Sequence, residues 1–174
     1  MIATRSPDVS GGRTTPAEAI TTGWLLCGVL DIAAAFGLAW VQAARPPGTV
    51  LRGVASALWG AAAMQGGAAM AAVGLVMHFG VALGWTLVFY AACRRLASLR
   101  TAPLLVVGPA YGAIVWTLMN YAVLPAVSWV RSLYLGTPPR WPGGMGWPML
   151  AIHLVFVGVP IVWGVRRAFS TRNP

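Results

Sequence analysis

One stretch restricts the folds that this chain can adopt: Ala69 to Ala92, about 24 residues without a charged side chain. A helix of that length crosses a hydrocarbon core of ~30 Å. Arg94 and Arg95 follow almost directly, and their side chains can reach lipid headgroups. The sequence therefore predicts a transmembrane helix over residues 69–92, around which the rest of the chain has to pack.

The composition extends this prediction to the whole chain. Only 9% of the 174 residues are charged and 58% are hydrophobic, whereas a soluble domain carries ~25% charged residues. Three more apolar stretches, at about residues 22–43, 103–124 and 148–165, bring the predicted spans to four. We expect an all-α integral membrane protein, with one transmembrane bundle over residues 22–167.

A cleaved signal peptide is the alternative interpretation of the first apolar stretch. Residues 41–43 have the small-x-small pattern of a cleavage site. However, the run is longer than the usual ~7–15 apolar residues of a signal peptide. It also contains Asp31, which an export signal does not need. We therefore favour a retained span.

The segments outside the four spans have distinct compositions. We expect residues 1–21 to form a disordered tail in which Thr15–Glu18 begins a short helix, and residues 168–174 to form a second tail. Residues 50–66 are helical in composition but too short to span, which predicts an interfacial or re-entrant helix that lies on the membrane or dips into it. The aromatic-rich segment 126–147 is typical of a loop at the membrane surface.

Three prolines mark the later spans. Pro109 should bend the third span, Pro125 should end it, and Pro160 should kink the fourth.

The arginines predict the orientation. All 12 cationic residues are arginines. With four spans, eight of them share the side that holds both termini and the 94–102 loop, and four lie on the other side. The positive-inside rule then places both termini in the cytoplasm, in a bacterial inner membrane.

The net charge of +9 does not indicate a nucleic-acid partner, because the arginines flank apolar spans and form no basic face. Anionic lipid headgroups are the natural counter-charge, so we expect the bilayer itself as partner. Cys27 and Cys93 have no metal-ligand spacing and are interpreted as small apolar fillers.

One acidic residue and both histidines lie inside predicted spans: Asp31, His78 and His153. A charged carboxylate at such depth costs roughly 3 kcal/mol, so Asp31 should face the bundle and be neutral or paired. His78 is the nearer histidine, at a predicted level ~8 Å from Asp31. A satisfied structural hydrogen bond is the first interpretation, and a proton or ion path is the second.

Two histidines on different helices could also ligate a haem b iron, but their predicted depths differ by ~6 Å. A metal bound with Asp31 would have no fourth ligand. We therefore expect no cofactor and no metal.

Small and polar residues suggest how the helices meet. Asn120 and Tyr111 are candidates for hydrogen bonds between helices. Glycines allow close helix contact because packing replaces the hydrophobic drive in membranes. The expected contact positions on spans two and three are Gly74, Gly80, Gly84, Gly108 and Gly112.

The chain resembles a set of uncharacterised bacterial four-helix inner-membrane proteins and, more distantly, the YagU-like proteins. Four features over residues 22–167 carry the resemblance: an early Asp31, a Gly/Ala-rich helix ending in His78-Phe79, the run PAYGAIVWTLMNYAVLP, and the run HLVFVGVPIVWGVRR. It departs from the YagU-like pattern after Leu124. The resemblance implies one four-helix unit and no particular substrate.

No nucleophile with a base, no paired carboxylates and no phosphate loop occur, so no catalytic activity is predicted. The leading hypothesis is a structural or accessory subunit of a membrane complex, or a homo-oligomer. Transport of protons, ions or small solutes through Asp31, His78 and His153 is one alternative, and a haem- or quinone-binding redox subunit is another.

Overall fold

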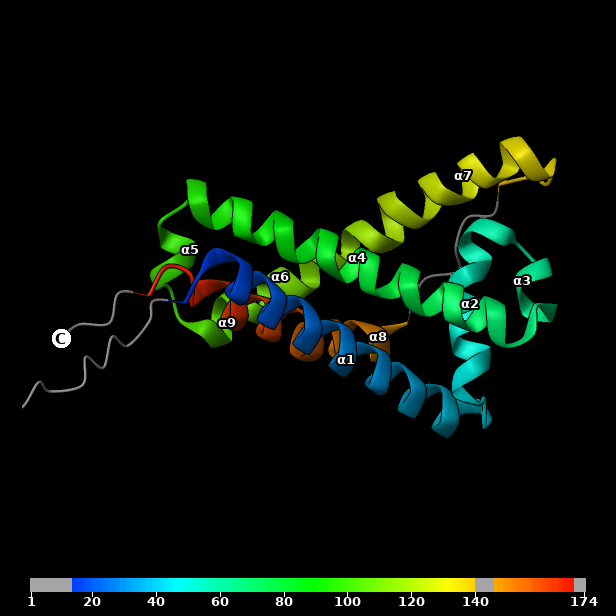
Figure 1. Ribbon diagram of the computed structural model, residues 1–174, viewed down its shortest axis with the longest axis horizontal. Coiled ribbons are helices and arrows are strands. Elements are labelled where there is room, and N and C mark those ends of the chain that lie inside the picture. The colour runs from blue at the N-terminus through cyan, green and yellow to red at the C-terminus, as the bar shows by residue number, and fades with distance from the viewer. Residues whose placement is uncertain (1–13, 140–145, 171–174) are drawn as a thin grey trace, which may run out of the picture.

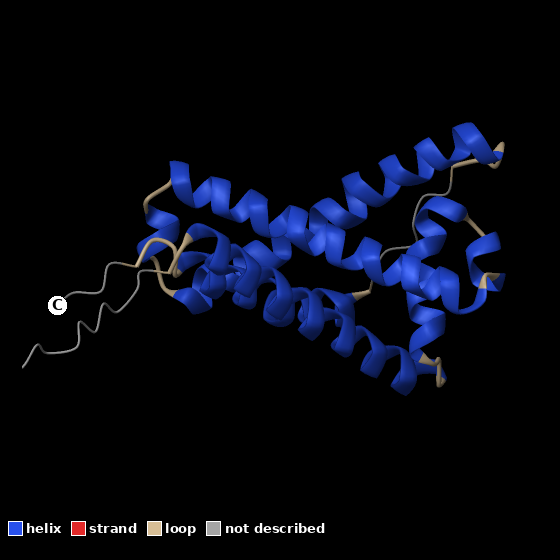
Figure 2. Ribbon diagram, in the orientation of Figure 1, coloured by secondary structure: helices blue, strands red, loops and turns tan. Residues whose placement is uncertain are grey.

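The computed structural model describes residues 14–139 and 146–170, and the regular structure within these ranges is helical (Figures 1 and 2). Four helices there are long and apolar enough to cross a membrane. The first is α1 (Pro16–Ala43) and the second is α4 (Gly67–Arg95). The third, Leu104–Leu135, joins α6 (Leu104–Leu118), a π-helical segment η1 (Met119–Val123) and α7 (Leu124–Leu135). The fourth, Trp147–Arg166, joins α8 (Trp147–Ile152), the π-helical η2 (His153–Gly158) and α9 (Val159–Arg166). The prediction of an all-α, multi-pass membrane protein is confirmed.

The fourth span is the centre of the bundle. Half of its most apolar window is buried, against 17–22% in the other three spans. Ile161, Val162 and Val165 of α9 are fully buried, and the helix packs on α1, α4 and α6. The outer spans instead expose large apolar side chains such as Val41, Val76 and Leu105, which is the surface expected to face lipid.

The first span begins earlier than predicted. Thr15 accepts a hydrogen bond from the Glu18 backbone N–H at 3.2 Å, and Glu18 accepts one from the Thr15 N–H at 2.8 Å. This capping box, with Pro16 at the first helical position, starts α1 at residue 16 instead of 22. The helical start at Thr15–Glu18 therefore opens the span itself, so the disorder predicted for residues 16–21 was wrong. Residues 1–13 of the predicted disordered tail and residues 171–174 of the second tail lie outside the described residues.

Pro125 does not end the third span, and that prediction was wrong. A proline inside an α-helix lacks a donor and its ring clashes with the carbonyl four residues earlier. Here η1 lies immediately before Pro125, and η2 lies in the same way before Pro160. The wider π turn accommodates each ring, so the helix continues. Part of the predicted surface loop, up to Leu135, is consequently helical.

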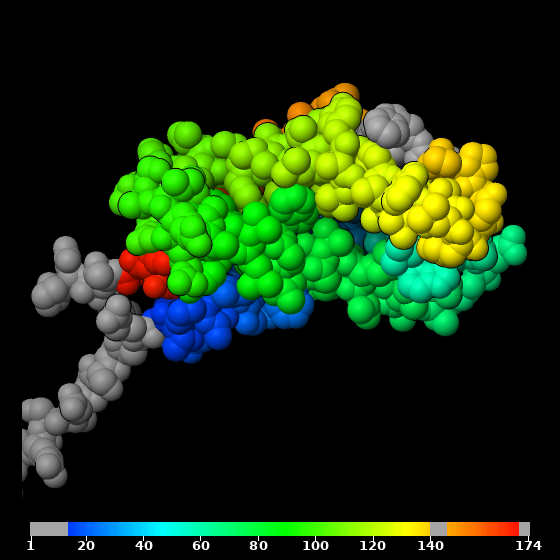
Figure 3. Space-filling model, turned by 90° about the horizontal axis from the view of Figure 1, so that it is seen from above, coloured from blue at the N-terminus to red at the C-terminus, as the bar shows by residue number. Residues whose placement is uncertain are grey.

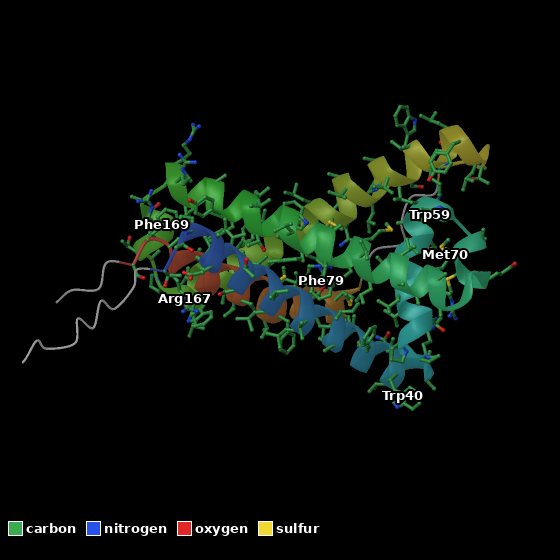
Figure 4. All side chains as sticks on the ribbon, viewed as in Figure 1. Trp40, Trp59, Met70, Phe79, Arg167 and Phe169 are labelled. Atoms are coloured by element: carbon green, nitrogen blue, oxygen red, sulfur yellow. The ribbon has the colours of Figure 1, made fainter. Side chains whose placement is uncertain are left out.

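Between the first two spans, α2 (Pro47–Trp59) and the short α3 (Ala62–Gln65) lie across one end of the bundle (Figure 1). The start of α1, the short α5 (Ser98–Thr101) and the end of α9 lie at the other end. Figure 4 shows Trp40 and Trp59 at the α2 end and Arg167 and Phe169 at the opposite end. The predicted extra helix thus exists, and it is packed crosswise on α4 and α7.

Arginine side chains hold the helix ends together. Arg131 of α7 donates to the carbonyls of Ser56 and Ala57 at 3.0 and 3.2 Å, and Tyr134 bonds the Leu58 carbonyl. These carbonyls belong to the last turn of α2, where the helix dipole is negative. The Ser56 carbonyl also accepts from the Gly60 N–H at 2.9 Å, so Arg131 is its second donor. Cationic capping therefore ties α2 to α7.

Candidate functional site

A half-open cavity between the helices is the main candidate for a functional site. It has a volume of about 700 Å³ and is lined by residues of α1, α2, α4, the third span and the fourth span. A recess between α4 and α7, near α2, is visible in Figure 3. Most lining side chains are apolar, including Ile32, Val54, Val81, Val115 and Leu124. Asp31, His78 and His153 line the same cavity, so the structure brings the acidic residue and both histidines of the predicted spans together.

The helix lengths explain why these residues meet. Asp31 lies 15 residues after the start of α1, and His78 lies 17 residues before the end of α4. At 1.5 Å per residue their levels therefore differ by ~3 Å, not the ~8 Å predicted from the shorter spans. His153 lies 13 residues before the end of α9, at a similar level.

Asp31 is paired more weakly than predicted. Its Oδ2 atom lies 3.9 Å from His78 Nδ1, which is too long for a hydrogen bond. Its Oδ1 atom is buried and has no donor among the described residues. Asp31 thus points into the bundle as expected, but the expected hydrogen bond is absent from the part of the chain that the structure describes.

His78 is fixed on the seam between α1 and α4. Its Nε2 donates to the carbonyl of Gly28 at 2.9 Å, and its ring meets Phe79 edge-on with centroids 5.4 Å apart. The Phe79 ring lies against the bare Cα of Gly28, while the Trp24 indole donates to the Phe79 carbonyl at 2.8 Å. Figure 4 shows Phe79 where α4 passes α1. These contacts lock the imidazole orientation.

His153 is anchored within its own helix. Its Nδ1 donates to the Met149 carbonyl, four residues earlier, at 2.8 Å. The residue is 7% exposed and begins η2. The π-helical segment of the third span also borders the cavity, because Met119 and Val123 of η1 are among the lining residues. Both π-helical segments therefore adjoin the cavity, as π turns often adjoin functional sites.

The other two polar candidates lie outside this cavity. The Tyr111 hydroxyl donates to the Trp85 carbonyl at 2.6 Å, which joins α6 to α4. The Asn120 amide donates to the Trp116 carbonyl at 2.9 Å within the third span. Among the described residues, no group of three His, Cys, Asp or Glu is arranged to hold a metal.

The glycines predicted to make close helix contacts fall into two groups in the structure. A Cβ on Gly74 would overlap the backbone of Leu51 in α2, and Cβ atoms on Gly108 and Gly112 would overlap the fourth span. These are close contacts of the kind expected. At Gly80 and Gly84, no atom of the described chain lies within 4 Å of the position that a Cβ would occupy, so the contact predicted for them is not formed within this chain.

The contribution of α2 to the site was missed by sequence reasoning. Val50, Val54 and Ala57 line the cavity. They stand at positions i, i+4 and i+7, the spacing of one helix face, which was the available signal. What the spacing does not say is which other helix that face meets.

Comparison with known proteins adds no assignment: no protein-family model, curated protein or solved structure matches this chain. The resemblance to the YagU-like proteins therefore stays a prediction.

Proposed function

We propose that this multi-pass membrane protein binds a lipophilic small molecule in the cavity between its spans. The observation that carries the proposal is the convergence of Asp31, His78 and His153, each from a different span, on one largely apolar cavity of about 700 Å³. Small-molecule sites typically measure ~300–1,000 Å³ and combine apolar walls with a few polar groups that orient the ligand.

The energetics support a binding role over a purely structural one. An ionisable side chain in the middle of a span costs roughly 2.5–3.5 kcal/mol on insertion scales. A structural role would offset that cost with hydrogen bonds, as His78 does through Gly28. Asp31 has a buried Oδ1 without a donor among the described residues, so hydrogen bonds within the described chain do not offset the cost of burying this carboxyl.

Two glycines of α4 provide a matched test. Gly80 lines the cavity and Gly84 does not, and a side chain at either position enters open space in the described chain. We expect Gly80→Leu to weaken binding of 1-adamantylmethanol at least tenfold, while Gly84→Leu leaves it unchanged. Binding is measured by equilibrium dialysis of protein in phosphatidylcholine nanodiscs, with empty nanodiscs subtracted. Equal binding by the two variants, or no binding above empty nanodiscs by the parent protein, would contradict the proposal.

The surroundings of the site follow from the charge pattern. We propose that the membrane is a bacterial inner membrane and that both termini are cytoplasmic. The excess of arginines on the side of the termini supports this orientation. It is also supported by the start of α1 and the end of α9 lying at one end of the bundle (Figure 1).

The role of a structural or accessory subunit, or of a homo-oligomer, is a second proposal that concerns the outer surface. It is supported by Gly84, which is exposed on α4, does not line the cavity and has open space where a side chain would stand. Such a position leaves room for a helix from another chain. Cross-linking in membranes through a cysteine at Gly84→Cys tests it, and a monomer at all cross-linker concentrations contradicts it.

A further inference from the structure

We infer that the cavity is built for a lipophilic amine, bound in its protonated form with its nitrogen between Asp31 and His78. The inference rests on the proposed function and specifies the chemical class of the ligand.

The two histidines both present acceptors. A carbonyl oxygen can only accept, so the Nε2 of His78 that bonds Gly28 and the Nδ1 of His153 that bonds Met149 must each carry the hydrogen. In a neutral imidazole the other nitrogen is then a lone-pair acceptor. His78 Nδ1 and His153 Nε2 are these acceptors, and neither has a donor among the described residues.

In its ionised form, the Asp31 carboxyl adds two more acceptors and a negative charge. Asp31 receives no hydrogen bond from the described residues, and its side chain is 15% exposed. No arginine is among the described residues that line the cavity, so no fixed cation of the protein neutralises the carboxylate there. A buried carboxylate without donors is costly, and a ligand that brings both charge and donors lowers that cost.

The spacing between the two side chains fits one nitrogen atom. Asp31 Oδ2 and His78 Nδ1 are 3.9 Å apart. A ligand nitrogen placed ~2.9 Å from both atoms, the usual hydrogen-bond length, would make an angle of about 85° between its two hydrogen bonds. Two N–H bonds of an ammonium group can reach both atoms with modest bending of each hydrogen bond. Asp31 and His78 are too far apart to bond to one another, and an ammonium group placed between them can bond to both.

Other ligand classes match less well. Quinone carbonyls, carboxylates and phosphates are acceptors and would face an acceptor cluster. An alcohol supplies one donor but no charge. The hydrocarbon part of an amine fits the apolar walls formed by residues such as Val54, Val81 and Val115. Trp85 also lines the cavity, and an indole ring is a favourable neighbour for an organic cation.

Three probes with one hydrocarbon body test the inference: 1-adamantylmethylamine, 1-adamantylmethanol and 1-adamantanecarboxylate. Binding to the full chain is measured by equilibrium dialysis in nanodiscs of zwitterionic phosphatidylcholine, with empty nanodiscs subtracted. We expect the amine to bind at least tenfold more tightly than the alcohol, and the carboxylate to bind more weakly than both. In Asp31→Asn, the preference for amine over alcohol should fall to about twofold or less.

The outcomes separate the two proposals. If the alcohol binds and Gly80→Leu blocks it, but the amine is not preferred, the cavity function stands and the amine inference is overturned. An unchanged amine preference in Asp31→Asn overturns it as well. The ranking of the probes on the parent protein does not depend on any variant, so a poorly folded Asp31→Asn still leaves that test in place. Absence of binding by all three probes contradicts the proposed function itself.

Discussion

Gly112→Ala is the substitution for which the structure makes the sharpest energetic prediction. Gly112 lies on α6, where it faces the backbone of η2. An added Cβ would lie 2.7 Å from the His153 carbonyl carbon and 2.8 Å from the Leu154 Cα, with the His153 carbonyl oxygen closer still. All three are backbone atoms, so no rotamer change can relieve the overlap.

The cost can be worked out from these distances. Carbon atoms pack at ~3.5–4.0 Å, so the two helices would have to separate by about 1 Å at this point. Overpacking of that kind costs ~1–3 kcal/mol. Gly84→Ala is the matched control, because it also replaces a mid-helix glycine but has no described atom within 4 Å. There the removal of glycine should stabilise the helix by ~0.5–1 kcal/mol.

Because both substitutions replace a mid-helix glycine, the helix gain cancels between them, and we expect Gly112→Ala to be less stable than Gly84→Ala by about 1–3 kcal/mol, measured by titration of the folded protein with SDS in mixed micelles. Because the displaced backbone belongs to His153, Gly112→Ala should also weaken probe binding in the cavity. If the two alanine variants unfold at the same SDS fraction, the close approach of α6 and η2 is refuted.

Three further predictions concern the rest of the bundle. Arg131→Met should lower the free energy of unfolding by ~1–3 kcal/mol, because it removes the hydrogen bonds that a charged donor makes to the Ser56 and Ala57 carbonyls; Arg131→Lys should recover only part of this, and full recovery would contradict the two-carbonyl cap. Asp31→Leu should leave stability unchanged or raise it, since Asp31 receives no hydrogen bond from the described residues, and an SDS titration showing a loss above ~2 kcal/mol would argue against that environment. Reporter fusions at residues 97 and 137 should give opposite topology readouts, because the third span separates them, and identical readouts are incompatible with four spans.

The local elements were predictable because their causes are local. The four apolar runs and the capping residues Thr15 and Glu18 are properties of short stretches of chain. The boundaries were less accurate where a tertiary solution overrode a local rule. Pro125 is the clearest case, because a π turn placed just before it removes the conflict that would otherwise end the helix.

The glycines illustrate a second limit. Gly74 and Gly80 lie on one helix and look equivalent in sequence. Gly74 supports α2, while Gly80 opens onto a cavity. Hydrophobic spacing cannot separate them, because in a membrane both lipid and a neighbouring helix are apolar surroundings.

The amino-acid sequence alone therefore determines that this chain spans a membrane four times, because the length and apolarity of a span are set by the thickness of the bilayer. It also determines which ionisable residues lie within the spans. Only the tertiary structure decides that Asp31, His78 and His153 share one cavity and that α2 forms part of its wall. That arrangement depends on the depth and rotation of each helix relative to the others, which are set by close packing between residues far apart in the chain.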